Sequence, residues 1–250
     1  MTLHVIQFSG GIGSFCAALR VAELHGTNDM VLLIADTLVE DEDLWRFADD
    51  TSRYLGVPLT RVCDGRTPWE VFHHVRFLGN SRFAACTQYL KQIPCREWME
   101  SYADPADTVA YIGIENTKRD KARIPAIERN WAPWRVEFPL CAKGEPWLSK
   151  DELLDEARAV GIEPPRMYEL GYSHNNCGGC CVKAGAGQWA HTLEVFPERF
   201  ARAEAEEAAL RERLGDVSIL RQTRQKTTYN LPLSELRKQV SAQDQQALTI

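Results

Sequence analysis

A short loop near the N-terminus combines glycine and serine in a way that suits phosphate binding. It joins an apolar run, His4–Phe8, to a helical pattern, Phe15–Leu24. Glycine lets the backbone approach an anion closely and adopt positive φ. The N–H groups at a helix start attract phosphate with the helix dipole behind them, and serine adds hydroxyl donors. The predicted nucleotide-binding residues are Ser9, Gly10, Gly11, Ile12, Gly13 and Ser14.

The spacing of this loop narrows the class of nucleotide enzyme. It matches neither GxxxxGK[ST] nor GxGxxG, which disfavours P-loop NTPases and Rossmann dehydrogenases. A plain tight turn between a strand and a helix is the alternative. The position after a first strand favours a ligand site, because open parallel sheets bind ligands at their carboxyl edge.

A second group of residues suits metal or redox chemistry. Cys177 and Cys180 are separated by two glycines, a spacing that lets two thiolates face one ion or cluster. Further ligands must come from elsewhere, and Cys181 and Cys95 compete for the fourth position. A [4Fe–4S] cluster, a structural Zn²⁺ that His174 could join, and a redox disulfide between Cys177 and Cys180 all remain open.

Composition limits the broad class of the protein. The chain has 250 residues, 44% hydrophobic and 26% charged, which allows one sizeable core. No apolar run approaches the roughly 20 residues that span a bilayer. The N-terminus lacks a basic leader region, so we expect a cytoplasmic protein without a membrane partner. Eight cysteines in such a chain are expected to be reduced.

The formal net charge of −6 argues against a generally basic nucleic-acid-binding surface. One local basic stretch stands out, and a solvated helix face is its alternative interpretation. It contains Lys118, Arg119, Lys121, Arg123, Arg129 and Arg135. Arg119 and Arg123 are spaced one helical turn apart and could reach one ligand together, either the phosphates of the nucleotide or a substrate anion. For Trp131, Trp134 and Trp147, core packing is the prediction.

Short β-branched runs alternate with helical patterns, which predicts an α/β protein with a mainly parallel sheet. The predicted strands are His4–Phe8, Met30–Ala35, Leu59–Val62, Thr108–Ile114 and Arg135–Leu140. Capping boxes predict helix starts at Thr67 and Ser149. We expect a nucleotide-binding α/β domain over residues 1–145. Residues 146–250 are expected to form a helical segment with the cysteine-rich loop, packed on the first domain, with a weakly patterned tail after Gly215.

The loop resembles the SGGxDS loop of the adenine-nucleotide α-hydrolase superfamily. This group includes the N-type ATP pyrophosphatases and the phosphoadenosine phosphosulfate (PAPS) reductases. Other segments are similar to the reductase branch and its uncharacterised relatives, including phage-borne ones, and the similarity covers about residues 1–190. These segments are Ala35-Asp36-Thr37, Cys86-Thr87, Leu90-Lys91-Gln92-Ile93-Pro94 and Tyr111-Ile112-Gly113-Ile114.

The resemblance implies a Rossmann-like, doubly wound sheet that binds ATP or PAPS. It adds Asp36, Thr37 and Gly113 to the expected nucleotide site and Cys86 to the expected metal ligands. The chain departs from the pyrophosphatases at Gly13, where their loop carries an Asp that helps hold Mg²⁺. Asp36 or the acidic cluster could supply oxygen ligands instead, although an acidic helix start explains the cluster equally well. The cluster is Glu40, Asp41, Glu42 and Asp43.

Three functional hypotheses follow. The first is an enzyme that activates a nucleic-acid component with ATP, releasing AMP and pyrophosphate, for cluster-assisted transfer of sulfur from a donor. The second is a sulfonucleotide reductase that releases sulfite with a thiol reductant, although no cysteine follows Cys181 to serve as that reaction's usual catalytic thiol. The third is a non-catalytic, zinc-stapled binding module. A homodimer is compatible with each, and no catalytic residue is assigned.

Overall fold

The computed structural model describes residues 1–247, and its contacts divide the chain into two compact units. Unit 1 comprises residues 1–36, 40–64 and 91–176. Unit 2 comprises residues 37–39, 65–90 and the described residues from Cys177 onward. Residues 146–176, expected in the C-terminal part, thus belong to unit 1, because Leu153, Ala157 and Ile162 are buried in its core.

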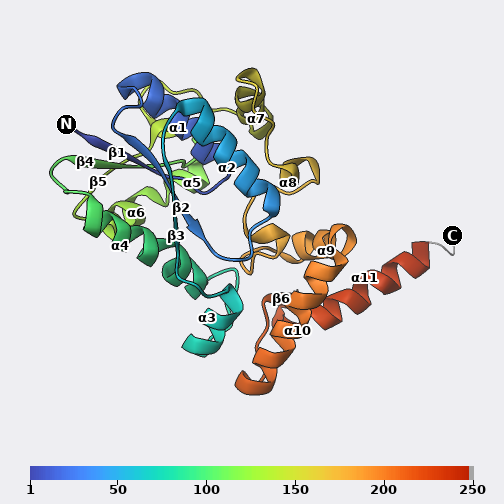
Figure 1. Cartoon of the computed structure of the whole chain (residues 1–250). Coiled ribbons are helices and arrows are strands. Elements are labelled where there is room, and N and C mark those ends of the chain that lie inside the picture. The colour runs from blue at the N-terminus through green and yellow to red at the C-terminus, as the bar shows by residue number, and fades with distance from the viewer. Residues whose placement is uncertain (248–250) are drawn as a thin grey trace. The chain divides into compact units, whose positions relative to one another are not determined.

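Unit 1 is an α/β fold built on a five-stranded parallel sheet (Figure 1). The strand order is β3-β2-β1-β4-β5, and Val5 in the central strand pairs with Val31 on one side and Ala110 on the other. The predicted α/β class is therefore confirmed, and the architecture is consistent with a Rossmann-like fold. The strands are β1 (Leu3–Gln7), β2 (Met30–Asp36), β3 (Leu59–Cys63), β4 (Thr108–Ile112) and β5 (Arg135–Glu137).

Helices cover both faces of this sheet because its three central strands, β2, β1 and β4, are largely buried on both sides. Successive strand residues point to opposite faces. Ile6 therefore belongs to the core beneath α1, α2 and α7, whereas Val5 belongs to the core beneath α4 and α6. The helices of unit 1 are α1 (Ile12–His25), α2 (Glu42–Leu55), α4 (Ile93–Tyr102), α5 (Lys118–Lys121), α6 (Ile124–Trp131), α7 (Lys150–Ala159) and α8 (Arg166–Glu169).

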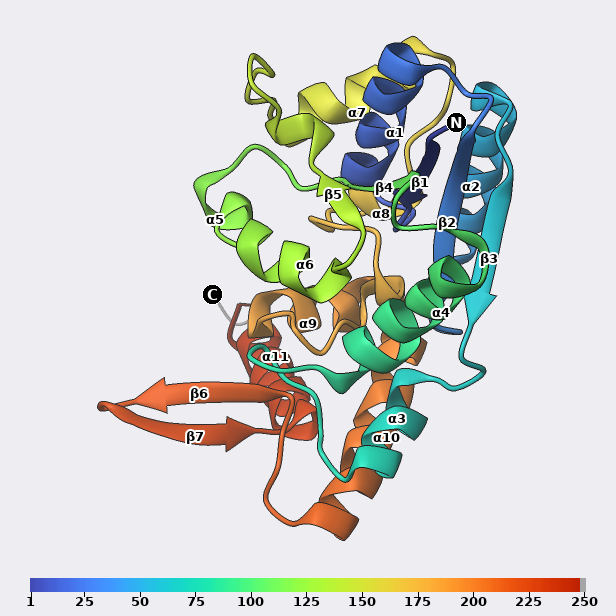
Figure 2. The same ribbon diagram turned by 90° about the vertical axis from the view of Figure 1, so that its left-hand side faces the viewer.

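Unit 2 combines helices with an antiparallel hairpin (Figure 2). The capping boxes predicted at Thr67 and at Ser149 in unit 1 are both present and begin α3 and α7. The hairpin and α11 lie in the tail after Gly215, where the sequence predicted no element. Unit 2 contains α3 (Pro68–Val75), α9 (Ala186–Val195), α10 (Pro197–Leu214), β6 (Leu220–Arg224), β7 (Thr227–Leu231) and α11 (Leu233–Ala247).

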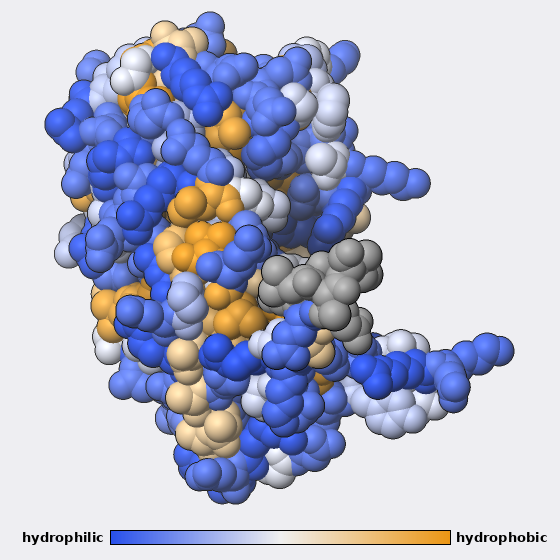
Figure 3. Space-filling view, turned by 90° about the vertical axis from the view of Figure 1, so that its right-hand side faces the viewer, coloured by the Kyte–Doolittle hydropathy of each residue, from blue (hydrophilic) through white to orange (hydrophobic). Residues whose placement is uncertain are grey.

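The surface is largely hydrophilic on the face shown in Figure 3. Within residues 1–247, none of the helices has both the length and the apolar character needed to cross a membrane. Trp131 and Trp134 are buried as expected, but Trp147 is 61% exposed, contrary to its prediction. Trp147 lies in the irregular stretch before α7, outside any regular element that could pack it into a core.

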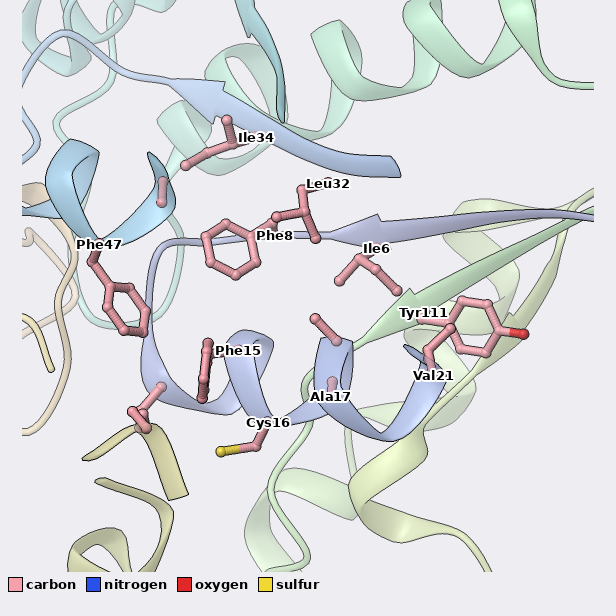
Figure 4. Packing of buried hydrophobic residues seen from close by; sticks show 14 of the residues in the cluster. Ile6, Phe8, Phe15, Cys16, Ala17, Val21, Leu32, Ile34, Phe47 and Tyr111 are labelled. Carbon is pink, nitrogen blue, oxygen red and sulfur yellow. The ribbon is translucent and has the colours of Figure 1, made fainter. Parts of the chain in front are cut away.

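Packing against β1 fixes the start of α1. Phe8 at the end of β1, Phe15 on α1 and Phe47 on α2 point toward one another in the core (Figure 4). The ring centres of Phe15 and Phe47 are 5.3 Å apart, and those of Phe8 and Phe47 are 6.4 Å apart. Phe8 and Phe15 flank the predicted phosphate loop, so aromatic packing holds both of its ends.

Candidate functional site: the glycine loop at the end of β1

The loop Ser9–Ser14 lies where the order of the sheet reverses. From β1 the chain builds β2 and β3 on one side, and it then returns to place β4 on the other side of β1. Ligands of open α/β sheets bind outside the carboxyl ends of the strands at such a reversal. The loop leaves the carboxyl end of β1, and Gly113 follows the carboxyl end of β4. Both segments therefore lie at the position that the topology favours for a ligand.

Two glycines here are required by their surroundings. Gly10 has φ of +71°, and a Cβ on it would lie 2.5 Å from Cγ of Leu44. A Cβ on Gly113 would lie 2.4 Å from the carbonyl oxygen of Gly13 and 2.6 Å from the backbone nitrogen of Ser14. No side chain fits at either position. The end of β4 and the first turn of α1 are thus in direct backbone contact.

The N-terminus of α1 is capped by a residue far away in the sequence. Its N-cap is Gly11, which has no side chain to accept a hydrogen bond. The Ile12 N–H donates instead to the Tyr168 hydroxyl at 3.0 Å, and the Ser14 hydroxyl donates to the Gly11 carbonyl at 2.7 Å. Gly10 to Gly13 are all buried. The loop is therefore partly lined by protein side chains, and three of its amides, those of Ser9, Ile12 and Ser14, are already engaged.

Other donors of the loop are not engaged in this way. Within residues 1–247, the N–H groups of Gly10, Gly11 and Gly13 meet no hydrogen-bond acceptor. Ser9 is exposed, and its hydroxyl lies 3.3 Å from the Ser14 hydroxyl, a long contact. Backbone amides at a helix start and exposed hydroxyls are the groups that bind phosphate oxygens.

A salt bridge fixes the segment that carries Tyr168. The Arg166 guanidinium donates to both carboxylate oxygens of Asp41, at 2.8 and 2.9 Å, and the side chain of Asp41 is fully buried. The Arg166 backbone N–H also donates to Asp43 at 2.8 Å. These contacts tie α8 to the start of α2. They hold the Tyr168 phenol in place against the loop.

Tyr168 is a neutral phenol at neutral pH, and burial disfavours its ionisation further. Burial raises the pKa of the phenol to about 12, with a smaller contribution from the negative charge of Glu115. Its oxygen accepts the Ile12 N–H, which leaves the hydroxyl hydrogen to be donated. A neutral phenol in this position can donate a hydrogen bond to an anion at the helix start.

Asn175 contributes a second side chain to the loop. It is 1% exposed, and its Nδ2 donates to the Gly10 carbonyl at 2.8 Å. Its Oδ1 is buried and has no hydrogen-bond partner in the described chain, and the same holds for Nδ1 of His174. A buried acceptor without a partner is costly, so these atoms mark a place where a donor from a ligand would be favourable.

Sequence reasoning missed Tyr168, Asn175 and Arg166. Tyr168 and Asn175 are 156 and 165 residues away from their partners in the loop. A local pattern contains no information about such distant contacts. The weak signal available was the position of Arg166 and Tyr168 just after Pro165, and of Asn175 inside the cysteine-rich stretch already singled out.

The lowered pKa of His174 predicts that the free energy of unfolding depends on pH. Burial lowers its pKa below the ordinary 6.5, with a further lowering by Lys91 and Lys150 and an opposing effect of Glu40. Between the lowered pKa and 6.5, the unfolded chain binds a proton that the folded chain does not bind. The free energy of unfolding should therefore fall as the pH falls below 6.5.

Urea unfolding between pH 5 and pH 7.5 measures this effect. The variant His174→Gln should show a shallower decline than the native protein. His4, whose pKa burial also lowers, contributes equally to both proteins and cancels in the comparison. Identical pH profiles would contradict the burial of a neutral His174.

The acidic residues proposed as metal ligands are held by cations. Asp36 pairs with Arg61, Glu40 with Lys91 at 3.1 Å, and Asp43 with Arg46. Asp41 pairs with Arg166 and accepts the Asp43 N–H as the N-cap of α2. In residues 1–247 no three His, Cys, Asp or Glu side chains are grouped so as to hold a metal ion. The structure supports the acidic helix start, the alternative interpretation of this cluster.

Arg119 and Arg123 do not belong to one continuous helix. Helix α5 ends at Lys121, and α6 begins at Ile124 with Pro125 in its first turn. Proline is favoured there because the first helical N–H groups have no partner inside the helix. Arg119 is exposed, and Arg123 pairs with Asp120 at 3.1 Å. Joint contact of Arg119 and Arg123 with one ligand stays a prediction, without the single continuous helix that their spacing indicated.

The resemblance also added Thr37 to the expected nucleotide site. Thr37 is 1% exposed and belongs to unit 2, whereas the loop Ser9–Ser14 belongs to unit 1.

The proposed cysteine ligands do not form a metal site as placed here. Cys16, Cys95, Cys141 and Cys180 carry free thiols. Cys86, Cys180 and Cys181 border the same apolar cluster of unit 2, and burial raises the pKa of Cys180 to about 11. Metal ligation requires the thiolate, which burial disfavours at Cys180 when no metal is bound. Cys177 begins a left-handed stretch with φ of +55° that continues through both glycines of the CxxC.

Cys95, predicted as the substitute for Cys181, is buried in a core cluster of unit 1, whereas Cys181 belongs to unit 2. Cys95 lies in this cluster beside Met99, and burial raises its pKa to about 12. Its place on the inner side of α4 explains this, because Pro94 starts that helix and turns Cys95 toward the sheet. Cys16 is likewise a core residue, as expected.

Comparisons with known proteins assign no family to this chain. No protein-family model matches the sequence, and no curated protein matches it.

Proposed function

We propose that this protein is an enzyme that binds an adenine nucleotide at the loop Ser9–Ser14 and uses ATP to activate a nucleic-acid component. The position of the loop at the reversal of strand order carries the proposal. The resemblance of the loop to that of the adenine-nucleotide α-hydrolases is the reason for proposing ATP as the nucleotide and activation of an acceptor as the type of reaction. The proposed fold family is accordingly the Rossmann-like fold of that superfamily.

The proposed reaction has two steps. An oxygen of the acceptor bonds to the α-phosphorus of ATP, pyrophosphate leaves with the bonding electrons, and the acceptor proton passes to solvent. A sulfur nucleophile then bonds to the acceptor carbon and displaces AMP. The protein would contribute orientation and hydrogen bonds to the phosphates. The donors are the loop amides and the hydroxyls of Ser9 and Tyr168.

The cysteines are left out of these steps. As placed in the described residues, they do not gather into the ligand set that a [4Fe–4S] cluster or zinc requires. Sulfur would therefore come from a separate donor, whose identity the proposal leaves open.

A product assay tests the reaction. The full chain is incubated with ATP labelled at the α-phosphorus, Mg²⁺ and sulfide, with RNA or duplex DNA as the acceptor in separate reactions. The proposal expects labelled AMP and an equal amount of pyrophosphate that depend on the acceptor. Absence of both products with every acceptor would contradict it.

Tyr168→Phe should weaken ATP binding about tenfold or more, since a hydrogen bond to a charged group contributes about 1.5–3 kcal/mol. The change removes only the hydroxyl and keeps the buried ring. Tyr54→Phe is the matched control, because Tyr54 is 51% exposed at the end of α2. Equilibrium titration measures both variants. Tighter binding by Tyr168→Phe would show that the phenol blocks the site instead of serving it.

A second candidate is a sulfonucleotide reductase that acts on PAPS or its unphosphorylated counterpart. The ion pairs of Asp36, Glu40 and Asp41 favour it, because these carboxylates are engaged with cations and no pyrophosphate need leave. Release of sulfite from PAPS with a thiol reductant, without AMP formation from ATP, would select this candidate.

A further inference from the structure

The β6–β7 hairpin is anchored at one end and exposed along the rest of its length. Leu220 and Leu231 pair across the strands and are buried in the core of unit 2. Beyond this pair the side chains are exposed, except for the half-buried Gln222 and Asn230. Figure 2 shows the two strands extending beyond the helices of unit 2. Such an arm contributes little to the core of its own unit.

The charge of the hairpin is opposite to that of the whole protein. Residues 221–230 include Arg221, Arg224 and Lys226 and no acidic residue, whereas the chain has a net charge of −6. Most other arginines of the chain are ion-paired, but these three cations have no partner within residues 1–247. Three unpaired cations on a projecting arm favour a polyanion as partner.

The turn of the hairpin holds two residues with long polar side chains in an unfavourable backbone conformation. Its two central residues, Gln225 and Lys226, have φ of +46° and +66°. Two-residue turns of this kind favour Asn-Gly, because positive φ is unfavourable for other residues. An unfavourable backbone conformation at an exposed tip suggests that the side chains serve a function there.

The two faces of the hairpin differ. On one face Gln222 lies opposite Tyr229, and its Oε1 accepts a hydrogen bond from Gln239 of α11 at 3.5 Å. On the other face Arg221 and the pair Thr223–Thr228 are exposed, with the two threonine hydroxyls 3.0 Å apart. This second face offers a guanidinium and hydroxyls together. Such groups contact phosphates and base edges.

We propose that the β6–β7 hairpin binds double-stranded DNA by entering its major groove. A two-stranded ribbon fits the major groove of B-form DNA, which is about 12 Å wide. The corresponding groove of A-form RNA is too narrow for side chains to read. The hairpin lies in unit 2 and the glycine loop in unit 1, so DNA binding does not depend on the proposed nucleotide chemistry.

Fluorescence anisotropy with the full chain and a labelled mixed-sequence duplex of about two helical turns tests this proposal. Three phosphate contacts at about −0.9 each give a salt slope near −2.7, so affinity should fall about 40-fold between 50 and 200 mM salt. The triple variant Arg221→Ala, Arg224→Ala, Lys226→Ala should bind much more weakly and lose most of this slope. ATP titration of the same variant should be unchanged, which separates this proposal from the proposed function.

The matched control replaces three exposed cations elsewhere, Arg53→Ala, Lys143→Ala and Arg158→Ala, with the same change of net charge. It should bind the duplex as the native protein does. Gln225→Asn with Lys226→Gly provides a favourable turn and removes one cation, so its slope should be less steep by about 0.9. Equal loss in the control and the triple variant would overturn the proposal. So would binding to phosphatidylserine vesicles or duplex RNA in preference to DNA.

Discussion

Replacing Gly113 by alanine is expected to abolish ATP binding and to lower the free energy of unfolding by about 2–3 kcal/mol. The added Cβ would lie 2.4 Å from the Gly13 carbonyl oxygen and 2.6 Å from the Ser14 nitrogen. Both atoms belong to the backbone of the loop and the first turn of α1, which cannot move aside as a flexible side chain would. The end of β4 and the loop must therefore separate.

Urea unfolding and ATP titration measure the two effects. Gly187→Ala is the matched control, because a Cβ there meets no atom within 4 Å and the residue lies in the first turn of α9. It should leave ATP binding unchanged and stabilise the protein slightly, since alanine favours helix over glycine. If Gly113→Ala bound ATP with native affinity, the loop geometry described here would not be the one that binds nucleotide.

Replacing Arg166 by leucine should lower the free energy of unfolding by about 2 kcal/mol. This loss of stability arises at Asp41, whose side chain is fully buried and would lose both hydrogen bonds to the guanidinium. Breaking a fully buried pair costs about 3–5 kcal/mol. We expect less here because the Arg166 side chain is 43% exposed and its charge is screened by solvent. Tyr168 would lose its anchor, so ATP affinity should fall as well.

A double variant separates the buried charge from other effects of the substitution. Asp41→Asn combined with Arg166→Leu removes both charges and leaves an acceptor to cap α2, so it should recover much of the lost stability. Arg158→Leu is the control, because its pair with Asp155 is exposed on both sides. It should change stability by less than about 1 kcal/mol. A double variant less stable than Arg166→Leu would contradict the role assigned to the buried charge.

The parts of the fold that depend on local chemistry were predictable from the sequence. Thr67 and Ser149 with their partners Glu70 and Glu152 start helices, because a capping box needs only residues three positions apart. The strands of the sheet followed from short apolar runs. The glycine loop followed from its glycines between a strand and a helix.

Features that depend on distant contacts could not be predicted. Tyr168 and Asn175 contact the loop from a segment that Arg166 ties to Asp41, and no local pattern encodes that salt bridge. The helix ends between Arg119 and Arg123, and a new helix begins with Pro125 in its first turn. Pro125 is a local signal, but the spacing of the two arginines does not take it into account.

The hairpin was missed for a different reason. Its turn uses Gln225 and Lys226 in place of the Asn-Gly pair that marks such turns in sequences. Its exposed strands carry polar residues on both faces, so they lack the alternation of apolar and polar residues that predicts a half-buried strand.

Calorimetric titration of the full chain with ATP, and separately with PAPS, tests the central claim most directly. We expect saturable binding of one nucleotide per chain, weakened about tenfold in Ser9→Ala, which removes one exposed hydroxyl donor. The account would be contradicted if a protein with the native circular dichroism spectrum bound neither nucleotide, or if Ser9→Ala and Gly113→Ala both bound with native affinity.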